Sequence, residues 1–177
     1  LVGFVTRRAG GATAAISAQA ITALMVWTMG SELLYDPWQP NVLFLPFWLL
    51  LCCVWAVVAG RVSLLPLTVG VASFVMQTHL SYLFIAPIMV AFAVVSILWE
   101  RRASSTRALD DLRRPALLSI GVFVVLWSQI LIEQFFGSGR GNLTRLTLAG
   151  TGGGQDTGFE SVRTGVPLAL RMMSAVV

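Results

Sequence analysis

The sequence contains no lysine, one histidine, two cysteines and few charged side chains of any kind. Only 11% of the 177 residues are charged and 56% are hydrophobic, whereas a soluble domain carries about a quarter charged residues. Such a chain has too little polar surface to cover a water-soluble globule, so we expect the lipid bilayer to be its solvent. The lack of lysine makes all 12 basic residues arginine and favours a bacterial genome rich in G and C.

The small numbers of histidine and cysteine residues also exclude several kinds of site. A single histidine, His79, rules out a multi-histidine metal site within the chain. Cys52 and Cys53 are adjacent in an apolar run, where neighbouring side chains on a helix point in different directions. A redox or metal pair is one interpretation, but small apolar packing residues are the better one. The arginines lie in short segments between apolar runs, which predicts no nucleic-acid partner.

Long apolar runs predict an all-α fold, a polytopic bundle of transmembrane helices that forms a single domain over residues 1–177. A membrane-crossing helix needs about 20 largely apolar residues. Five windows approach this length, and a sixth is cut off at the end of the sequence: 12–29, 42–59, 62–77, 82–99, 116–136 and, in part, 166–177. Pro46, Pro66 and Pro87 lie inside these windows and should kink or interrupt their helices. Neither end reads as a natural terminus, so we expect a piece of a longer protein.

Arginine placement predicts the orientation of the spans. If the spans alternate, the segments around residues 7–8, 61 and 100–115 share one side, and they hold eight of the twelve arginines. Positive loops are retained in the cytoplasm, so this side is expected to be cytoplasmic in a bacterial plasma membrane. The loop 100–115 should contain a short surface helix that ends at Pro115. Residues 31–41 and the Gly-rich loop 137–165 are then extracytoplasmic.

Most of the remaining ionisable groups gather on the predicted outer face. Six of the nine acidic or histidine side chains lie there: Glu32, Asp36, His79, Glu133, Asp156 and Glu160. Ionisable groups at the end of a span are costly unless they are paired or solvated, so such placement usually has a function. The outer face is therefore where we expect chemistry.

Glu32 and Asp36 are the candidate catalytic residues. On a helical turn they are four residues apart and share a face, where two carboxylates can act as base and partner or hold a divalent metal. A structural interpretation competes for Asp36, which can cap a helix that starts at Pro37, with Gln39 completing a capping box. Glu32 has no comparable structural role. A metal requirement stays open, and no metal ligand is assigned.

Five further residues are candidate substrate contacts. Gln77, His79 and Tyr82 belong to a polar turn between two spans, which either binds substrate or only satisfies the turn. Trp38 lies in the first outer loop, among aromatic residues typical of a membrane interface. Arg140 is a candidate phosphate ligand or a partner of Glu133. The glycines around Arg140 lack the Lys-Ser/Thr of a phosphate-binding loop, so a flexible loop is the better interpretation.

Several segments resemble a group of actinobacterial multispanning proteins that are similar to the GT-C class of membrane glycosyltransferases. The resemblance is carried by residues 27–40, 45–47, 77–82, 127–129, 133–134 and 141–143. Its most distinctive parts are Asp36-Pro37-Trp38 and Gln77-Thr78-His79. GT-C enzymes take sugars from polyprenyl-phosphate carriers at the outer membrane face. Their catalytic acid lies in a first outer loop that would precede Leu1, so the resemblance implies that the chain alone is inactive.

The leading hypothesis is therefore a fragment of an integral membrane glycosyltransferase that transfers a sugar from a lipid-phosphate donor to a cell-envelope glycan acceptor. The alternative is a membrane transporter or flippase for a lipid or small solute. Transporters place polar groups on broken helices at mid-membrane, and the midspans here hold only scattered Ser, Thr, Gln and Gly. A purely structural subunit would explain the spans but give the outer polar cluster no task.

Overall fold

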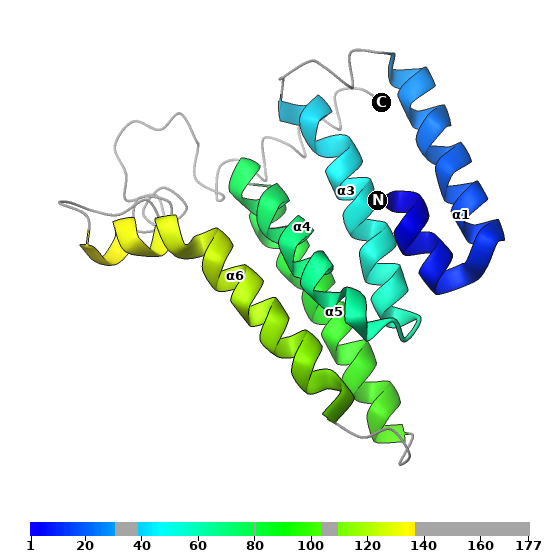
Figure 1. Cartoon of the computed structure of the whole chain (residues 1–177). Coiled ribbons are helices and arrows are strands. Elements are labelled where there is room, and N and C mark those ends of the chain that lie inside the picture. Colours follow the sequence, from blue (N-terminus) through cyan, green and yellow to red (C-terminus); the bar gives the residue numbers. More distant parts are fainter. Residues whose placement is uncertain (31–38, 80, 104–109, 137–177) are drawn as a thin grey trace, which may run out of the picture. The chain divides into compact units, whose positions relative to one another are not determined.

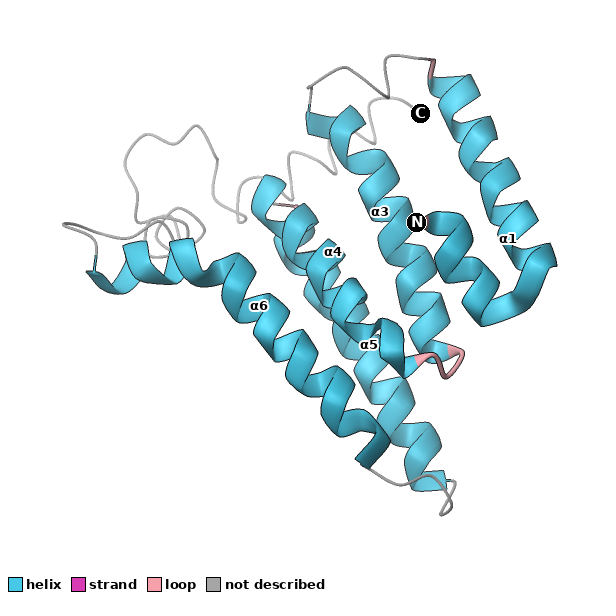
Figure 2. Cartoon of the chain, viewed as in Figure 1, coloured by secondary structure: helices cyan, strands magenta, loops and turns pink. Residues whose placement is uncertain are grey.

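The computed structural model describes residues 1–30, 39–79, 81–103 and 110–136. Within these ranges every regular element is a helix (Figures 1 and 2). The chain divides into two compact units, Leu1–Leu126 and Trp127–Val177. The first unit holds nearly all of the described helices, and the second is described only over the last turns of one helix.

Five α-helices and one 3₁₀ helix make up the described chain. They are α1 (Val2–Met29), α3 (Gln39–Val58), η1 (Val62–Leu64), α4 (Leu65–Thr78), α5 (Tyr82–Ala103) and α6 (Asp110–Phe136). Among the described residues, α1, α3, α5 and α6 are long and apolar enough to cross a membrane. Helices pair all their backbone groups internally, as hydrocarbon requires. The predicted all-α bundle of membrane-spanning helices is confirmed.

The window 62–77 differs from the other predicted spans. It forms the short helix η1 followed by α4, which has only 14 residues and is about 21 Å long. Gly60, with a φ of 86°, makes the turn after α3. Pro66 then lies in the first turn of α4, where its missing N–H costs nothing. Pro66 therefore starts a helix instead of interrupting one.

Helix α1 contains two helical segments that meet at Gly11. The second segment coincides with the predicted window 12–29, and the segment before Gly11 was not predicted. In the structure the helix begins at Val2 and bends at Gly11, whose φ of 77° and ψ of −163° are not helical. The two segments pack side by side, since a Cβ on Gly3 would lie 3.1 Å from the side chain of Gln19.

The connection predicted at residues 100–115 is shorter in the structure than in the prediction. Helix α5 continues to Ala103, and α6 begins at Asp110 and runs through Pro115. Pro115 is the sixth residue of α6, so it removes a single backbone hydrogen bond near the start of the helix. The prediction of a surface helix that ends at Pro115 is therefore wrong, because residues 110–115 are the start of α6. The remaining residues of this connection, the loop 137–165 and the partial span 166–177 lie outside the described residues.

The arginine-bearing segments lie at one end of the first unit. Figure 1 shows the bend of α1, the turn between α3 and η1, the end of α5 and the start of α6 at the same end. A Cβ on Gly10, at the bend, would lie 3.0 Å from the ring of Trp55 near the end of α3. We call this the arginine end; the turn between α4 and α5 lies at the opposite end.

The core of the first unit is built around α3. Leu50, Cys53, Ala56 and Val57 of α3 are completely buried, together with Val75 of α4. Both cysteines are buried and free, which agrees with a packing role. Large apolar side chains on α1, α5 and α6 are exposed instead, as expected where helices face lipid.

One side-chain hydrogen bond joins α1 to α3. The indole N–H of Trp48 donates to the hydroxyl of Thr22 over 3.0 Å. The Thr22 hydroxyl in turn donates to the Ala18 carbonyl over 2.7 Å. Both side chains are half-buried, so this chain of bonds sets how α1 packs on α3.

A double-mutant cycle with Trp48→Phe and Thr22→Val should therefore give a favourable coupling energy. We expect about 0.6 kcal/mol, and at most about 1.7 kcal/mol, the range for interhelical hydrogen bonds in membranes. Unfolding by SDS in mixed micelles measures it. Thr28→Val is the control, because Thr28 bonds only to carbonyls of its own helix. Additive effects of the two substitutions would mean that the contact does not hold α1 in place.

Candidate functional site

The candidate site starts at the polar turn, which we define as Gln77, Thr78, His79, Ser81 and Tyr82. Helix α4 stops at Thr78 because His79 is extended, with a φ of −148° and a ψ of 132°. The His79 N–H donates to the Val75 carbonyl over 3.2 Å, and the His79 carbonyl accepts from the Tyr82 N–H over 3.1 Å. These two bonds close the turn and begin α5.

The imidazole of His79 is held by both a hydrogen bond and a ring contact. Its Nδ1 accepts from the backbone N–H of Ser81 over 3.2 Å. Tyr82 lies edge-on to it, with ring centroids 6.1 Å apart, and Phe47 of α3 packs against Tyr82 at 5.0 Å. An accepting Nδ1 places the proton of the neutral ring on Nε2. Since His79 is only partly buried, Nε2–H can donate to a ligand oxygen.

Gln77 and Thr78 of the polar turn form side-chain hydrogen bonds to the backbone of α6 and α4. The Gln77 side-chain amide donates to the Leu126 carbonyl of α6 over 3.0 Å. The Thr78 hydroxyl donates to the Phe74 carbonyl, one turn back in α4, over 2.7 Å. Gln77 therefore links α4 to α6 at this end of the first unit.

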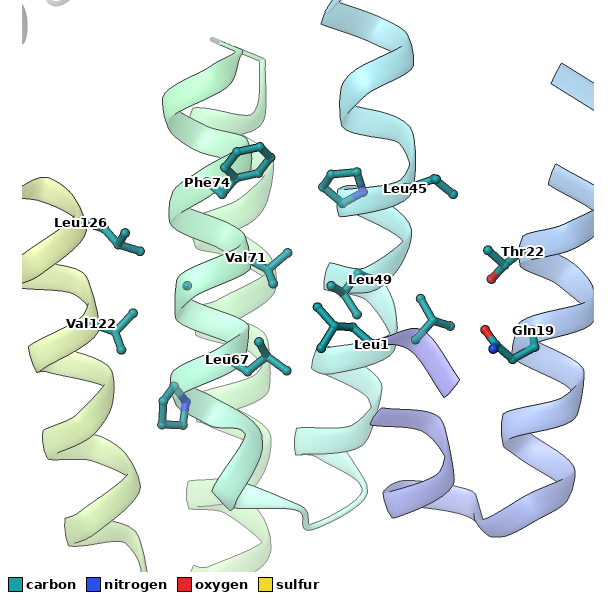
Figure 3. A pocket seen from close by; sticks show the side chains of 14 residues that line it. Leu1, Gln19, Thr22, Leu45, Leu49, Leu67, Val71, Phe74, Val122 and Leu126 are labelled. Atoms are coloured by element: carbon teal, nitrogen blue, oxygen red, sulfur yellow. The ribbon is translucent and has the colours of Figure 1, made fainter. Parts of the chain in front are cut away.

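An open apolar cavity of about 810 Å³ lies next to these contacts, and we call it the main groove. Its walls come from α1, α3, α4 and α6 (Figure 3), and its polar side chains are Gln19 and Thr22 of α1. The lining is Leu1, Val2, Gln19, Thr22, Leu45, Pro46, Leu49, Pro66, Leu67, Gly70, Val71, Phe74, Val122 and Leu126. Figure 3 shows Leu67 and Phe74 at opposite ends along α4.

Two residues that line the main groove are hydrogen-bonded to the polar turn. Phe74 and Leu126 line the groove, and their carbonyls accept the hydrogen bonds from Thr78 and Gln77. The main groove therefore extends to residues that are hydrogen-bonded to the polar turn. An apolar groove beside a polar turn suits an amphipathic ligand with an apolar tail and a polar head.

The structure places three of the seven predicted site residues. His79 and Tyr82 are in ring contact, and Gln77 lies two residues before His79 on the end of α4. The catalytic candidates Glu32 and Asp36 and the substrate candidates Trp38 and Arg140 lie outside the described residues. Within the described ranges no group of three or more His, Cys, Asp or Glu side chains is arranged to hold a metal ion.

Two parts of the site were not predicted as contacts. Phe47 packs against Tyr82, but α3 is apolar on all sides, so no pattern in the sequence distinguishes Phe47 from its neighbours. The main groove combines residues more than 100 positions apart, such as Leu1 and Leu126. Only the packing of the helices brings them together.

Comparison with family models, with curated proteins and with solved structures finds no match to this chain.

The neutral imidazole of His79 should carry its proton on Nε2. The ¹⁵N NMR shifts of the ring, measured in bicelles at alkaline pH, should show a pyridine-type Nδ1 and a pyrrole-type Nε2. Ser81→Pro removes the donor to Nδ1 and should produce a mixture of tautomers. Ser81→Ala keeps the backbone N–H and should leave the shifts unchanged. A proton found on Nδ1 in the unmodified chain would contradict the geometry of the turn.

Proposed function

We propose that this chain is a membrane-embedded part of a glycosyltransferase that transfers a sugar from a polyprenyl-phosphate carrier to a cell-envelope acceptor. The junction between the main groove and the polar turn carries the proposal. An isoprenoid tail would lie in the groove, and its phosphate would meet the donors at the end of α4. The resemblance of residues 77–82 to membrane glycosyltransferases points to the same chemistry.

The size and chemistry of the groove support a lipid-linked donor. Its volume of about 810 Å³ falls in the range of ligand sites in proteins. Lipid tails are as apolar as the groove wall, so burial there adds little affinity within a membrane. The groove would instead orient the carrier, and the polar turn would supply the selective contacts.

His79 has the geometry of a phosphate donor. With Nδ1 bonded to the Ser81 N–H, Nε2–H would donate to a phosphate oxygen as negative charge develops on the leaving group. Tyr82, braced by Phe47, would hold the imidazole in this orientation. Gln77 would fix the end of α4 against α6 through its bond to Leu126.

The reaction also needs a base, which we assign to the predicted pair Glu32 and Asp36. One carboxylate would accept the proton of the acceptor hydroxyl as its oxygen bonds to the anomeric carbon. The bond between the sugar and the phosphate breaks, and the carrier phosphate leaves with the bond electrons. Trp38 is the proposed sugar platform, and Arg140 a second ligand for the phosphate.

The location that goes with this function is a bacterial plasma membrane, with the arginine end in the cytoplasm. The retention of positive loops on the cytoplasmic side supports it. The polar turn, at the opposite end of the first unit, would then face the outer side. Lipid-linked sugars and cell-envelope acceptors would meet there.

Transport is the weaker candidate. A transporter needs polar groups exposed along a path through mid-membrane. Here the Thr68 hydroxyl donates to the carbonyl of Leu64 in η1, and the hydroxyls of Ser96 and Ser119 each donate to a carbonyl one turn back in their own helix. Such bonds satisfy the side chains locally and offer little to a passing solute.

Sugar transfer from a radiolabelled polyprenyl-phosphate sugar, in membranes with the full-length protein, tests the function. His79→Ala should lower kcat by about 100-fold, the usual effect of losing one donor to a developing negative charge. His79→Gln should recover part of the rate. Ser96→Ala, which removes a hydroxyl bonded to the Phe92 carbonyl outside the site, should change it little. Glu32→Ala or Asp36→Ala should abolish transfer.

Unchanged transfer in the His79 and both carboxylate variants would remove the site assignment. Absence of transfer from every donor, together with uptake of a solute into vesicles, would favour a transporter instead.

A further inference from the structure

A second apolar groove, of about 510 Å³, lies between α4, α5 and α6, and we call it the second groove. Its lining includes Ala91, Val94 and Val95 of α5 and Ser119 and Ile120 of α6. Val95 is 58% exposed and Ile120 is 60% exposed, so the groove is open to the bilayer. The Ser119 hydroxyl donates to the Pro115 carbonyl, which leaves the interior apolar in character.

Both α5 and α6 carry an arginine two helical turns beyond a residue that lines the second groove. Arg102 follows Val95 by seven residues, and Arg113 precedes Ile120 by seven. Seven residues are two turns, so Arg102 lies on the side of α5 that bears Val95, and Arg113 on the side of α6 that bears Ile120, about 10 Å along the axis. Arg113 also lines a separate pocket with Leu117 and Leu118. Both arginine side chains are exposed. The end of α5 and the start of α6 both belong to the arginine end.

The charge at this end is positive. Residues 100–114 hold five arginines and three carboxylates. A guanidinium binds phosphate through two parallel hydrogen bonds, which makes arginine the usual ligand where a phosphate must be oriented. An apolar groove alone would accept the tail of any lipid. Arginines at headgroup level would select a lipid by its charge.

We propose that the second groove binds one anionic glycerophospholipid, with an acyl chain between α5 and α6 and its phosphate held by Arg102 and Arg113. The bound lipid would brace α6 against α4 and α5. The two arginines lie at the arginine end, opposite the polar turn, and the proposal does not depend on the proposed glycosyltransferase activity.

Native mass spectrometry of the purified chain tests the headgroup contact. The chain is equilibrated with equal amounts of dioleoyl phosphatidylglycerol and dioleoyl phosphatidylcholine. We expect one phosphatidylglycerol to be retained with roughly 25-fold preference, since each of the two arginines near the anionic headgroup contributes about five-fold. The pair Arg102→Gln and Arg113→Gln should bring the ratio close to one. The control pair Arg7→Gln and Arg61→Gln removes the same charge from the same end and should preserve the preference.

A second arm tests the groove itself. Ala91→Phe fills it and should lower retention of the dioleoyl lipid several-fold. Ile88→Phe places the same ring on α5 at an exposed residue outside the lining and should not. Dihexanoyl phosphatidylglycerol and inorganic phosphate should compete poorly, because neither fills the groove.

Equal retention of the two dioleoyl lipids by the unmodified chain would overturn the proposal, as would a preference that survives loss of both arginines. Strong competition by inorganic phosphate would show an ion site without a lipid. If the double arginine variant fails to fold by circular dichroism, the comparison of Ala91→Phe with Ile88→Phe still decides.

Discussion

In hydrocarbon every polar group must find a partner within the protein, and this constraint organises the whole chain. The backbone meets it by forming helices. The hydroxyls of Thr22, Ser96 and Ser119 meet it by bonding to carbonyls of their own helices, and that of Thr68 by bonding to Leu64 in η1. These hydroxyls therefore have little capacity left to bind a ligand. The groups able to bind a charged ligand are concentrated where helices end, at the polar turn and at the arginine end.

The short helix α4 connects this constraint to the proposed function. Helices η1 and α4 together measure about 27 Å, slightly less than a hydrocarbon core of about 30 Å. The polar turn would thus lie close to the boundary between acyl chains and headgroups. At that depth the Nε2–H of His79 can meet a phosphate whose tail stays in the apolar groove below. Both ends of the bundle would then recognise a lipid phosphate, the outer one as substrate and the arginine end as a bound lipid.

Hydropathy predicted the helices well because 20 apolar residues have few alternatives in a membrane. It missed the helical segment of α1 before Gly11, where Arg7 and Arg8 interrupt the apolar pattern, and it placed a helix end at Pro115, through which α6 continues. The polar turn was predicted from its composition, but its contact with Phe47 was not. The two grooves arise from packing between helices, which no periodicity encodes.

The most direct test of the account is to find where the carrier tail lies. A polyprenyl phosphate with a diazirine close to its phosphate is photolysed in membranes containing the protein, and the adducts are mapped by mass spectrometry. Adducts should concentrate on Phe74 and Leu126, and Gly70→Phe should abolish them, whereas Gly121→Phe, where a side chain meets open space, should not. Adducts spread over lipid-facing residues such as Ile88, and unchanged by Gly70→Phe, would contradict the account.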